Sequence, residues 1–530
     1  EIQASDWSSD VCSSDLVAQL HQRDLFHLRC ELQMGYAQRA KQCSGVLVRA
    51  CSLSYLATRL LRDYSLLMPT RSKTFDSHYP VTGDAIGTFP IHTDADVRVA
   101  VAQARIASDK WVALGFRGRK KVLLAWSKLL MERVEECTAL ISMETGKPVS
   151  DAKLEASLAA GHLAWAARHA QEVMRTSHRS PGAVMANMSA TVERSPVGVV
   201  GVIGPWNYPI FTPMGSIAYA LAAGNTVVFK PSEFTPGVGV WLARTFAEVA
   251  PFSNIFLCVT GLGDTGRALC EAHVDKLAFT GSTKTAMVVA ATCAKTMTPV
   301  VLECGGKDPV IVAHDADIKR AAENTIWSSM SNGGQTCIGA ERVYVVESVA
   351  DEFIAAMLEA VKNIKPGEPG VGNYGPATMP KQLDIIASHI KDAIKSGGRA
   401  IYGGAKSVKD PYVEPVILVD VPEDSMAMQD ETFGPTIVIN RVKNVDEAII
   451  LSNASRYGLG ASIWSKRQGK RIAAQLHCGM VAINSTISFA AVASVPFGGV
   501  KDSGYGRIHG PEGILEFTYA RTIVRARFQL

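Results

Sequence analysis

Short runs of β-branched residues alternate with helical segments between residues 198 and 312, and this alternation constrains the fold more than any other feature. One helical segment opens with proline after Thr235, and another ends before Gly224, as helix boundaries do. Such alternation predicts an α/β fold with a parallel, doubly wound sheet, whose ligands bind at the carboxyl ends of the strands. The predicted strands are residues 198–203, 226–229, 255–259, 276–279, 300–302 and 310–312.

The preceding region, from about residue 79, is mainly helical. Residues 79–111 predict a turn, a short strand and a helix capped by Thr93, and helical patterns follow at 117–145, 153–174, 213–223 and 236–249. We expect these helices to cover the sheet.

Polar and glycine-rich sequences follow four of the predicted strands. Because the carboxyl ends of parallel strands lie at one edge of a sheet, these sequences should form one rim. They read GPWNYP at 204–209, KPSE at 230–233, TGST at 280–283 and ECGGK at 303–307.

A further loop, SNGGQTCI at 331–338, presents Cys337 after two glycines. The chain has 11 cysteines, an odd number without metal-ligand spacing, which predicts free thiols in a reducing compartment and no metal site. Cys304 is a rival nucleophile. It directly follows Glu303, however, so in an extended segment it should face the packing on the opposite side.

The sequence GLGDTG at 261–266 matches a dinucleotide-binding pattern. No acid lies about 20 residues further on to hold a ribose, so we interpret it as a glycine turn. The turn at Gly281 and Ser282, at a predicted helix start, is the better phosphate site.

Composition narrows the functional classes. With 530 residues, a net charge of +4, no dense basic run and no long apolar run, the chain predicts neither nucleic-acid nor membrane partners, and a cytoplasmic location. Residues 1–16 resemble translated adaptor sequence and are excluded from the fold. Residues 34–73 are basic and leucine-rich, which fits a transit peptide or, as we favour, an amphipathic surface helix.

Seven motifs occur in the order typical of the NAD(P)-dependent aldehyde dehydrogenase superfamily, and from about residue 79 to the C-terminus the chain resembles that family. They are PWNYP, KPSE, FTGST, LECGGK, GQTC, ETFGP and PFGGVKDSGYGR. Within the family the chain looks most similar to bacterial succinate-semialdehyde dehydrogenases.

The resemblance implies a domain order. Residues 79–186 and 199–307 would form a Rossmann-type cofactor domain, after an N-terminal extension at 1–78. Residues 308–479 would form an α/β catalytic domain. Residues 187–198 and 480–530 would form a small β oligomerisation element and C-terminal segment. Residues 190–194 and 522–528 alternate like exposed strands, so we expect pairing between subunits of a homodimer or homotetramer.

The chemistry of aldehyde oxidation needs a nucleophile, because the aldehyde hydrogen leaves as hydride only from a tetrahedral adduct. The resemblance implies Cys337 as this nucleophile, Asn207 and the Cys337 backbone N–H as oxyanion donors, and Glu303 as general base. A carboxyl beside Leu302 and Cys304 should have a raised pKa.

The resemblance also implies residues that hold NAD or NADP. Glu233 would accept from a free ribose 2′-hydroxyl and repel a 2′-phosphate, which favours NAD, whereas Lys230 and Lys284 leave NADP open. The set is Trp206, Lys230, Ser232, Glu233, Gly281, Ser282, Glu431 and Phe433.

The aldehyde itself stays open, and the resemblance makes succinate semialdehyde, oxidised to succinate, the first candidate. Gly215 and Ser216 stand where many relatives carry Trp-Lys, which should widen the substrate tunnel. Ser331 stands where some succinate-semialdehyde enzymes carry Arg, so no cation for a substrate carboxylate is evident. An apolar tunnel for a bulkier aldehyde is the alternative, and the candidate substrate residues are Tyr208, Phe211, Met214 and Phe497.

Two other functions remain open. A CoA-acylating enzyme would pass the thioester to coenzyme A, but such relatives commonly lack the Glu303-type base. A non-catalytic binding protein on the same fold is the second alternative.

Overall fold

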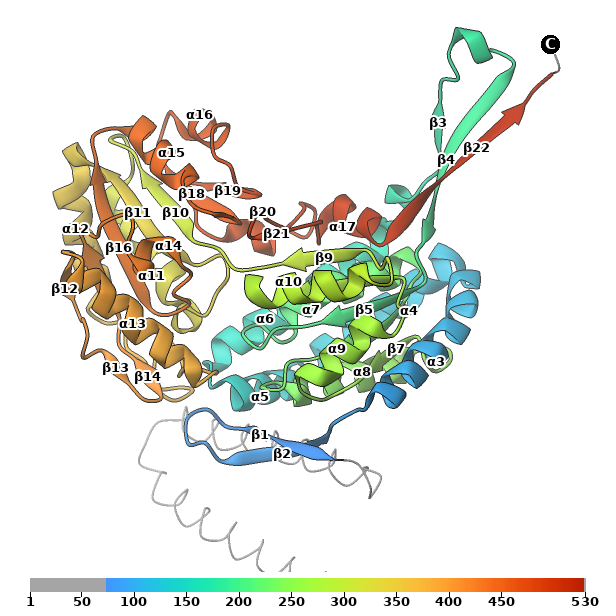
Figure 1. Ribbon diagram of the computed structural model, residues 1–530, viewed down its shortest axis with the longest axis horizontal. Coiled ribbons are helices and arrows are strands. Elements are labelled where there is room, and N and C mark those ends of the chain that lie inside the picture. Colours follow the sequence, from blue (N-terminus) through green and yellow to red (C-terminus); the bar gives the residue numbers. More distant parts are fainter. Residues whose placement is uncertain (1–72, 529–530) are drawn as a thin grey trace, which may run out of the picture. The chain divides into compact units, whose positions relative to one another are not determined.

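The computed structural model describes residues 73–528 (Figure 1). A six-stranded sheet with the order β21–β9–β8–β5–β6–β7 carries five of the predicted strands in parallel, which confirms the doubly wound arrangement. These strands are β5 (Val199–Ile203), β6 (Thr226–Lys230), β7 (Phe256–Cys258), β8 (Lys276–Thr280) and β9 (Val300–Glu303). The sixth, β21 (Gly504–Tyr505), comes from near the C-terminus and pairs antiparallel with β9.

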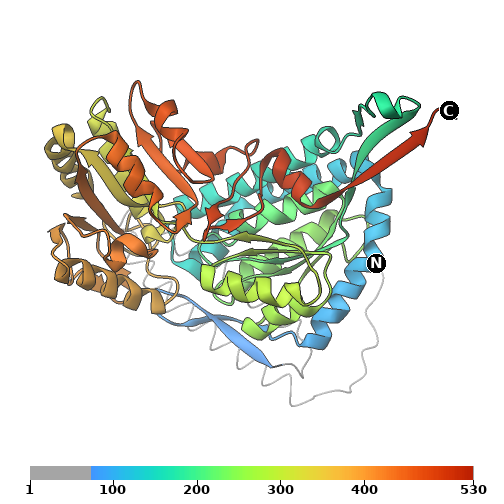
Figure 2. The same cartoon turned by 45° about the horizontal axis from the view of Figure 1, so that its top comes forward.

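Helices pack around this sheet, as Figures 1 and 2 show. Thr93 caps the first of them with a reciprocal capping box to Asp96, as predicted. The pattern at 117–145 is two helices that meet at Arg133, where no Gly or Pro marks the break. The helices are α3 (Asp94–Ala113), α4 (Gly115–Glu132), α5 (Val134–Thr145), α6 (Val149–Val173), α7 (Phe211–Ala223), α8 (Pro236–Val249), α9 (Gly263–Glu271) and α10 (Thr283–Ala294).

A seven-stranded sheet with the order β12–β15–β16–β11–β10–β18–β19 forms the second α/β unit. Its central strands β10 (Asp308–Val312) and β11 (Ala340–Val346) are buried along their whole length, because helices cover both faces. The other strands are β12 (Arg399–Tyr402), β15 (Val416–Val419), β16 (Thr436–Val442), β18 (Gly460–Trp464) and β19 (Met480–Ile483). The helices are α11 (Ile318–Met330), α12 (Glu347–Val361), α13 (Lys381–Lys395), α14 (Met426–Gln429), α15 (Val445–Asn453) and α16 (Gly469–Ala473).

The segments expected to pair between subunits pair with each other. β22 (Thr518–Ala526) runs antiparallel to β4 (Met188–Pro196), with Thr522 opposite Val192, and β3 (Ser177–Arg179) completes a three-stranded sheet. β22 keeps an unpaired, largely exposed edge. The segment after residue 479 thus contributes to the seven-, six- and three-stranded sheets, through β19, β21 and β22.

The remaining elements are short. The hairpin of β1 (Thr74–His78) and β2 (Ala85–Pro90) begins before residue 79, where the folded pattern was expected to start. The predictions for residues 1–16 and nearly all of 34–73 lie outside the described residues. Two small ladders pair β13 (Val408–Lys409) with β14 (Tyr412–Val413) and β17 (Tyr457–Gly458) with β20 (Val500–Lys501), and α17 (Gly510–Glu516) precedes β22. Among residues 73–528, no helix has the length and apolar character needed to cross a membrane.

Candidate active site

Cys337 lies in a tight loop between a 3-10 turn, Ser331–Gly334, and β11. Asn332, Gly333 and Gly334 all have left-handed backbones. A Cβ at Gly334 would lie 2.0 Å from the Gly434 carbonyl oxygen, so only glycine fits there. The loop therefore presents a half-buried thiol from a rigid turn at the start of the second sheet.

Glu303 ends β9 in the first sheet and is buried, and neither of its carboxyl oxygens has a hydrogen-bond partner among residues 73–528. Burial holds its pKa well above the usual range, as predicted from its neighbours Leu302 and Cys304. A Cβ at Gly498 would lie 2.8 Å from one Glu303 oxygen. A buried, unpaired carboxyl is costly, and such a group marks a functional site more often than a structural one.

Carboxyl groups surround Cys337. Burial raises the pKa of the thiol, and Glu431, Asp308 and Glu303 raise it further in that order. Burial also raises the pKa of Glu431 to about 8 and that of Asp308 to about 7. Near neutral pH the thiol therefore holds its proton in this structure.

The rival thiol, Cys304, is buried in the cluster that packs under α10, next to Leu302. Burial raises its pKa to about 12. This agrees with the prediction that it faces the packing. The glycine-rich sequence at 261–266 joins β7 to α9, and a Cβ at Gly261 would lie 2.1 Å from Thr265 Oγ1 in that helix.

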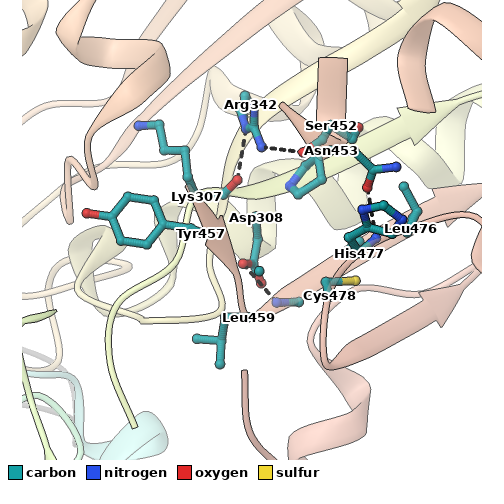
Figure 3. A pocket seen from close by; sticks show the side chains of 14 residues that line it. Lys307, Asp308, Arg342, Ser452, Asn453, Tyr457, Leu459, Leu476, His477 and Cys478 are labelled. Carbon is teal, nitrogen blue, oxygen red and sulfur yellow. Dashed lines mark hydrogen bonds between the residues drawn. The ribbon is translucent and has the colours of Figure 1, made fainter. Parts of the chain in front are cut away.

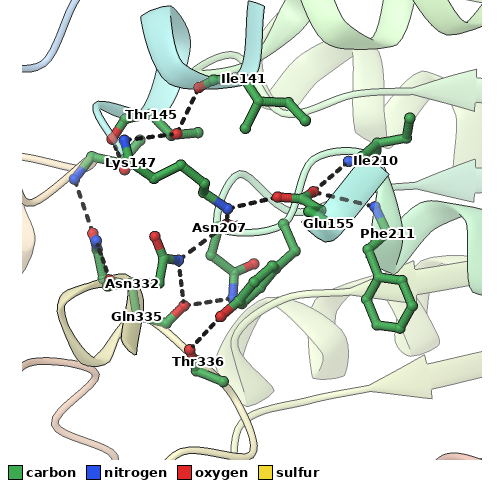
Figure 4. A network of polar contacts seen from close by, with 12 residues as sticks. Ile141, Thr145, Lys147, Glu155, Asn207, Ile210, Phe211, Asn332, Gln335 and Thr336 are labelled. Atoms are coloured by element: carbon green, nitrogen blue, oxygen red, sulfur yellow. Dashed lines mark hydrogen bonds and ion pairs between the residues drawn. The ribbon is translucent and has the colours of Figure 1, made fainter. Parts of the chain in front are cut away.

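Asn207 reaches the Cys337 loop from the other sheet (Figure 4). Its buried side-chain Nδ2 donates to the Gln335 carbonyl oxygen at 2.9 Å, two residues before Cys337. Next to it, the Tyr208 hydroxyl lies 2.8 Å from Thr336 Oγ1. The fold thus brings together the loops that carry Asn207 and Cys337, 130 residues apart in the chain.

Sequence reasoning missed a buried ion pair beside Asn207. Lys147 donates from Nζ to Glu155 Oε2 at 2.6 Å and to the Asn207 carbonyl oxygen at 2.7 Å (Figure 4). Both charged side chains are 1% exposed. The only available signal was the interruption GKP at residues 146–148 between two helical patterns, which a surface lysine would give equally.

The predicted adenine-ribose residues lie together at the carboxyl end of β6. Lys230 Nζ is 3.5 Å from Glu233 Oε2, and Ser232 Oγ is 3.4 Å from the same oxygen. Burial lowers the pKa of Lys230, and Glu233 opposes this effect. The Glu233 side chain is 41% exposed, so it can accept from a ligand hydroxyl.

The predicted phosphate and nicotinamide residues also meet at this edge. Ser282 caps α10 and accepts from the Thr285 amide, and the Gly281 amide donates to the Glu303 carbonyl oxygen. Glu431 Oε1 accepts from the Gly306 amide at 3.1 Å, and the rings of Phe433 and Trp206 meet edge to face at 5.6 Å. A helix N-terminus flanked by a glycine and by the side chains predicted to hold a ribose fits a dinucleotide cofactor.

The candidate substrate residues separate into two kinds. Tyr208 and Phe211 are half-buried, whereas Met214 and Phe497 are buried, and Met214 has no exposed surface. The expectation that Gly215 widens a tunnel was wrong. A Cβ at Gly215 would lie 2.7 Å from His509 Nε2 and 2.8 Å from Ile508 Cδ1, so these side chains fill the space.

His509 forms the centre of an aromatic cluster with Phe211, Phe497, His162 and Tyr219. Its two ring nitrogens are buried without partners, as is His162 Nε2. Burial lowers the pKa of both histidines, that of His162 to about 4, so the cluster is uncharged near neutral pH. Ser331 is half-buried, and its hydroxyl donates to the Trp327 carbonyl oxygen at 2.6 Å.

A separate polar pocket lies beside Asp308 (Figure 3). Arg342 donates there to the carbonyl oxygens of Lys307 and Ser452, and Asp308 accepts from the Gly460 amide. None of the predicted site residues lines it. Within residues 73–528 no three His, Cys, Asp or Glu side chains gather as metal ligands would.

Known sequences resemble this chain over most of its length. A model of the aldehyde dehydrogenase family matches residues 67–523. The chain is 37% identical over 445 residues to 4,4'-diapolycopene aldehyde oxidase of Methylomonas sp, covering 83% of each protein. It is 36% identical over 458 residues to glutarate-semialdehyde dehydrogenase of Pseudomonas aeruginosa, covering 84% of this chain and 94% of that enzyme.

Solved structures share the fold. An aldehyde dehydrogenase from Brucella melitensis biovar abortus 2308 gives a TM-score of 0.82 at 33% identity, covering 86% of this chain and 95% of the other. NADP-dependent glyceraldehyde-3-phosphate dehydrogenase from Bacillus halodurans C-125, solved with NADP, gives 0.81 at 34% identity, covering 86% and 96%. With the motifs and this geometry, these matches establish that the chain belongs to the aldehyde dehydrogenase family and is an NAD(P)-dependent oxidoreductase that oxidises aldehydes.

Proposed function

We propose that the chain oxidises an aldehyde to the carboxylic acid through Cys337, Asn207 and Glu303. The observation that carries this proposal is the buried, unpaired Glu303 carboxyl, which acts electrostatically on the Cys337 thiol. One side-chain N–H of Asn207 donates to the Gln335 carbonyl oxygen. The second N–H is available to donate to a developing oxyanion.

The Cys337 thiol gives its proton to solvent water, and its sulfur forms a bond to the aldehyde carbon, whose oxygen becomes an oxyanion held by Asn207 and the Cys337 amide. The carbon–hydrogen bond of this adduct then breaks, the hydrogen leaving as hydride, and the oxyanion reforms a carbonyl as a thioester. The nicotinamide of a bound NAD(P)⁺ supplies the hydride acceptor. Glu303 takes a proton from the water that attacks the resulting thioester, and the carbon–sulfur bond breaks to release the acid and the thiolate.

We propose NAD as the preferred cofactor. The Glu233 carboxylate is half exposed at the end of β6, where it can accept from a 2′-hydroxyl and would repel a 2′-phosphate. Lys230 is close enough to offset part of that repulsion. NADP should therefore support slower turnover.

For the substrate we propose an uncharged aldehyde. Phe211 and Phe497, the two candidate residues with ring contacts, both contact the neutral imidazole of His509. A dicarboxylic semialdehyde, the substrate type in the name of the Pseudomonas aeruginosa relative, is the second candidate. Such a substrate needs a cation for its carboxylate.

We also propose a homo-oligomer. β22 has an unpaired edge on which Ile523 and Val524 are exposed by 40% and 56%. A strand edge with exposed apolar residues is usually covered in the native assembly.

The decisive experiment follows NAD(P)H absorbance with propanal, hexanal, benzaldehyde and succinate semialdehyde, each with NAD and with NADP, without coenzyme A. Turnover supports the hydrolytic mechanism. The Cys337→Ala variant should lose it while binding cofactor, whereas the matched Cys304→Ala variant should keep it. Turnover that requires coenzyme A would replace the proposal with acyl transfer, and activity in Cys337→Ala would overturn the nucleophile.

A further inference from the structure

Lys147 is a buried cation whose contacts all lead towards Asn207. It lies in the connection between α5 and α6, and its Nζ donates to the Asn207 carbonyl oxygen and to Glu155. The same Nζ lies 4.2 Å from the centre of the Tyr208 ring, where a cation is attracted by the ring face. The ammonium group is thus fixed on three sides.

Glu155 extends this attachment to the next helix. Its Oε1 accepts from the amides of Ile210 at 3.0 Å and Phe211 at 3.3 Å, where α7 begins. The ion pair therefore holds both ends of the segment 207–211, one through a carbonyl and the other through helix-start amides.

The orientation of the Asn207 amide is fixed from the Cys337 loop. The Gln335 carbonyl oxygen accepts from Asn207 Nδ2 and from Asn332 Nδ2, which is 3.2 Å away. A reversed Asn207 amide would place its oxygen against that carbonyl, two acceptors in contact. Asn332 Nδ2 also donates to the Asn207 carbonyl oxygen at 3.1 Å, the same oxygen that Lys147 holds.

We propose that Lys147, paired with Glu155, is a positioning residue that aims the Asn207 amide at the carbonyl oxygen of the aldehyde bound to Cys337. This rests on the proposed oxyanion role of Asn207. Without the Lys147 contact, the Asn207 carbonyl keeps only the Asn332 donor, and the amide shifts away from Gln335.

The molecule offers a matched control in a second buried ion pair. Lys307 bonds to Glu341, and their side chains are 1% and 7% exposed. Glu341 accepts from the amides of Thr432 and Phe433, beside the cofactor residue Glu431. Neutralising this pair should affect cofactor binding, while neutralising Lys147 and Glu155 should affect the reaction at Cys337.

The test compares the double variants Lys147→Met/Glu155→Gln and Lys307→Met/Glu341→Gln with the wild type, because double substitution leaves no unpaired buried charge. Single-turnover NADH formation at saturating NAD should slow by about 10- to 100-fold in the first variant, since losing one oxyanion donor costs roughly 10²–10³ and displacement loses part of it. The KM of this variant for NAD should stay within about twofold of wild type. The second variant should instead raise the KM for NAD and keep the single-turnover rate.

The proposal would be overturned if the Lys147→Met/Glu155→Gln variant loses single-turnover rate and NAD affinity by equal factors. It would also be overturned if this variant keeps the wild-type single-turnover rate. If the first variant fails to fold, Asn332→Gly removes the other donor to Asn207 and suits the left-handed backbone at 332. This variant should slow single-turnover NADH formation by a smaller factor and leave the KM for NAD within about twofold of wild type. An unchanged single-turnover rate would overturn the proposal.

A crystal structure of the folded variant supplies a reading that does not depend on activity. The Asn207–Gln335 hydrogen bond should be lost, and its retention would overturn the positioning role even if the wild type oxidises no aldehyde. Wild-type silence with every aldehyde would instead overturn the proposed function.

Discussion

The two buried ion pairs hold two loops through different sets of groups. In the Lys147–Glu155 pair both ions contact the segment 207–211, the cation through the Asn207 carbonyl oxygen and the anion through two backbone amides. In the Lys307–Glu341 pair the anion contacts the backbone amides at 432 and 433, and the cation donates to the Thr432 hydroxyl. The sign of the charge follows the backbone group it satisfies, since carbonyls accept and amides donate.

The loops proposed for the reaction and for the cofactor are thus held by separate ion pairs. Lys147 and Glu155 both come from the region around the first sheet, whereas Lys307 directly precedes β10 and Glu341 lies in β11 of the second. Substitutions should therefore affect one set of loops at a time.

The largest expected effect comes from breaking the second pair on one side only. Lys307→Met leaves the Glu341 carboxylate buried without its cation, and such a loss costs about 3–5 kcal/mol of unfolding free energy. Urea unfolding followed by circular dichroism measures it. The double variant with Glu341→Gln should recover most of the loss, and a single-variant cost below about 1 kcal/mol would show that solvent reaches Glu341.

The next largest effect should come from adding a Cβ at a glycine beside each ion pair, because the added atom meets backbone in one region and a side chain in the other. A Cβ at Gly375 would lie 2.1 Å from the Gly146 carbonyl oxygen, next to Lys147, and a backbone atom cannot easily move away. A Cβ at Gly305 would meet the Glu431 carboxyl at 2.3 Å, which can rotate away.

Gly375→Ala should therefore cost about 1–3 kcal/mol of unfolding free energy, the usual range for overpacking. Gly305→Ala should lower the unfolding free energy by a smaller amount. It should raise the KM for NAD, because the added Cβ displaces Glu431. Thermal unfolding and steady-state kinetics on both variants test the contrast, which fails if Gly305→Ala is the less stable protein.

Changing pH should affect activity and stability in opposite directions. The proposed mechanism needs the deprotonated Cys337 thiol and Glu303 carboxyl, whose pKa values burial raises, so kcat/KM for the aldehyde should rise as pH increases from 7 to 9. Glu431 and Asp308 have folded pKa values raised to about 8 and about 7, above their values of 4.5 and 3.8 in the unfolded chain.

Between the unfolded and folded pKa values the folded state binds more protons than the unfolded state, so the stability that these two groups give at acid pH is lost as pH rises from about 4 to about 8. The Tm of the cofactor-free protein should fall from pH 5 to pH 8. Glu431→Gln should reduce that slope, and a Tm that rises over this interval would contradict the assigned protonation.

The smallest effect is expected at an exposed ion pair, which serves as a comparison for the two buried pairs. Lys128 and Glu132 lie one turn apart on α4, with an N–O distance of 3.4 Å and side chains 78% and 56% exposed. Lys128→Ala should change the unfolding free energy by only about 0.3–0.5 kcal/mol, as measured by denaturant titration. A larger change would mean that burial is not what distinguishes the two ion pairs.

Sequence reasoning could predict the features whose signals are local. The parallel strands of the first sheet have β-branched runs, and Thr93 is followed by Asp96 as a capping box requires. The motif residues Asn207 and Glu303 follow predicted strands, and a parallel sheet places such residues along one edge.

The missed features depend on residues far apart in the chain. A buried lysine such as Lys147 looks like a surface lysine until its partners are placed around it. The space at Gly215 is filled by His509, 294 residues later, so local sequence could not show that the space is closed. The helix break at Arg133 has no Gly or Pro to mark it.

The pairing of Glu303 with Gly504 has a consequence for biosynthesis. β21 begins 201 residues after β9 ends, so a nascent chain can complete most of the first sheet while Glu303 still lies on an open edge. Translation must pass the Gly498–Gly504 region before the proposed base acquires its neighbours from that region. The surroundings of Glu303 are therefore complete only when nearly all of the described chain has been made.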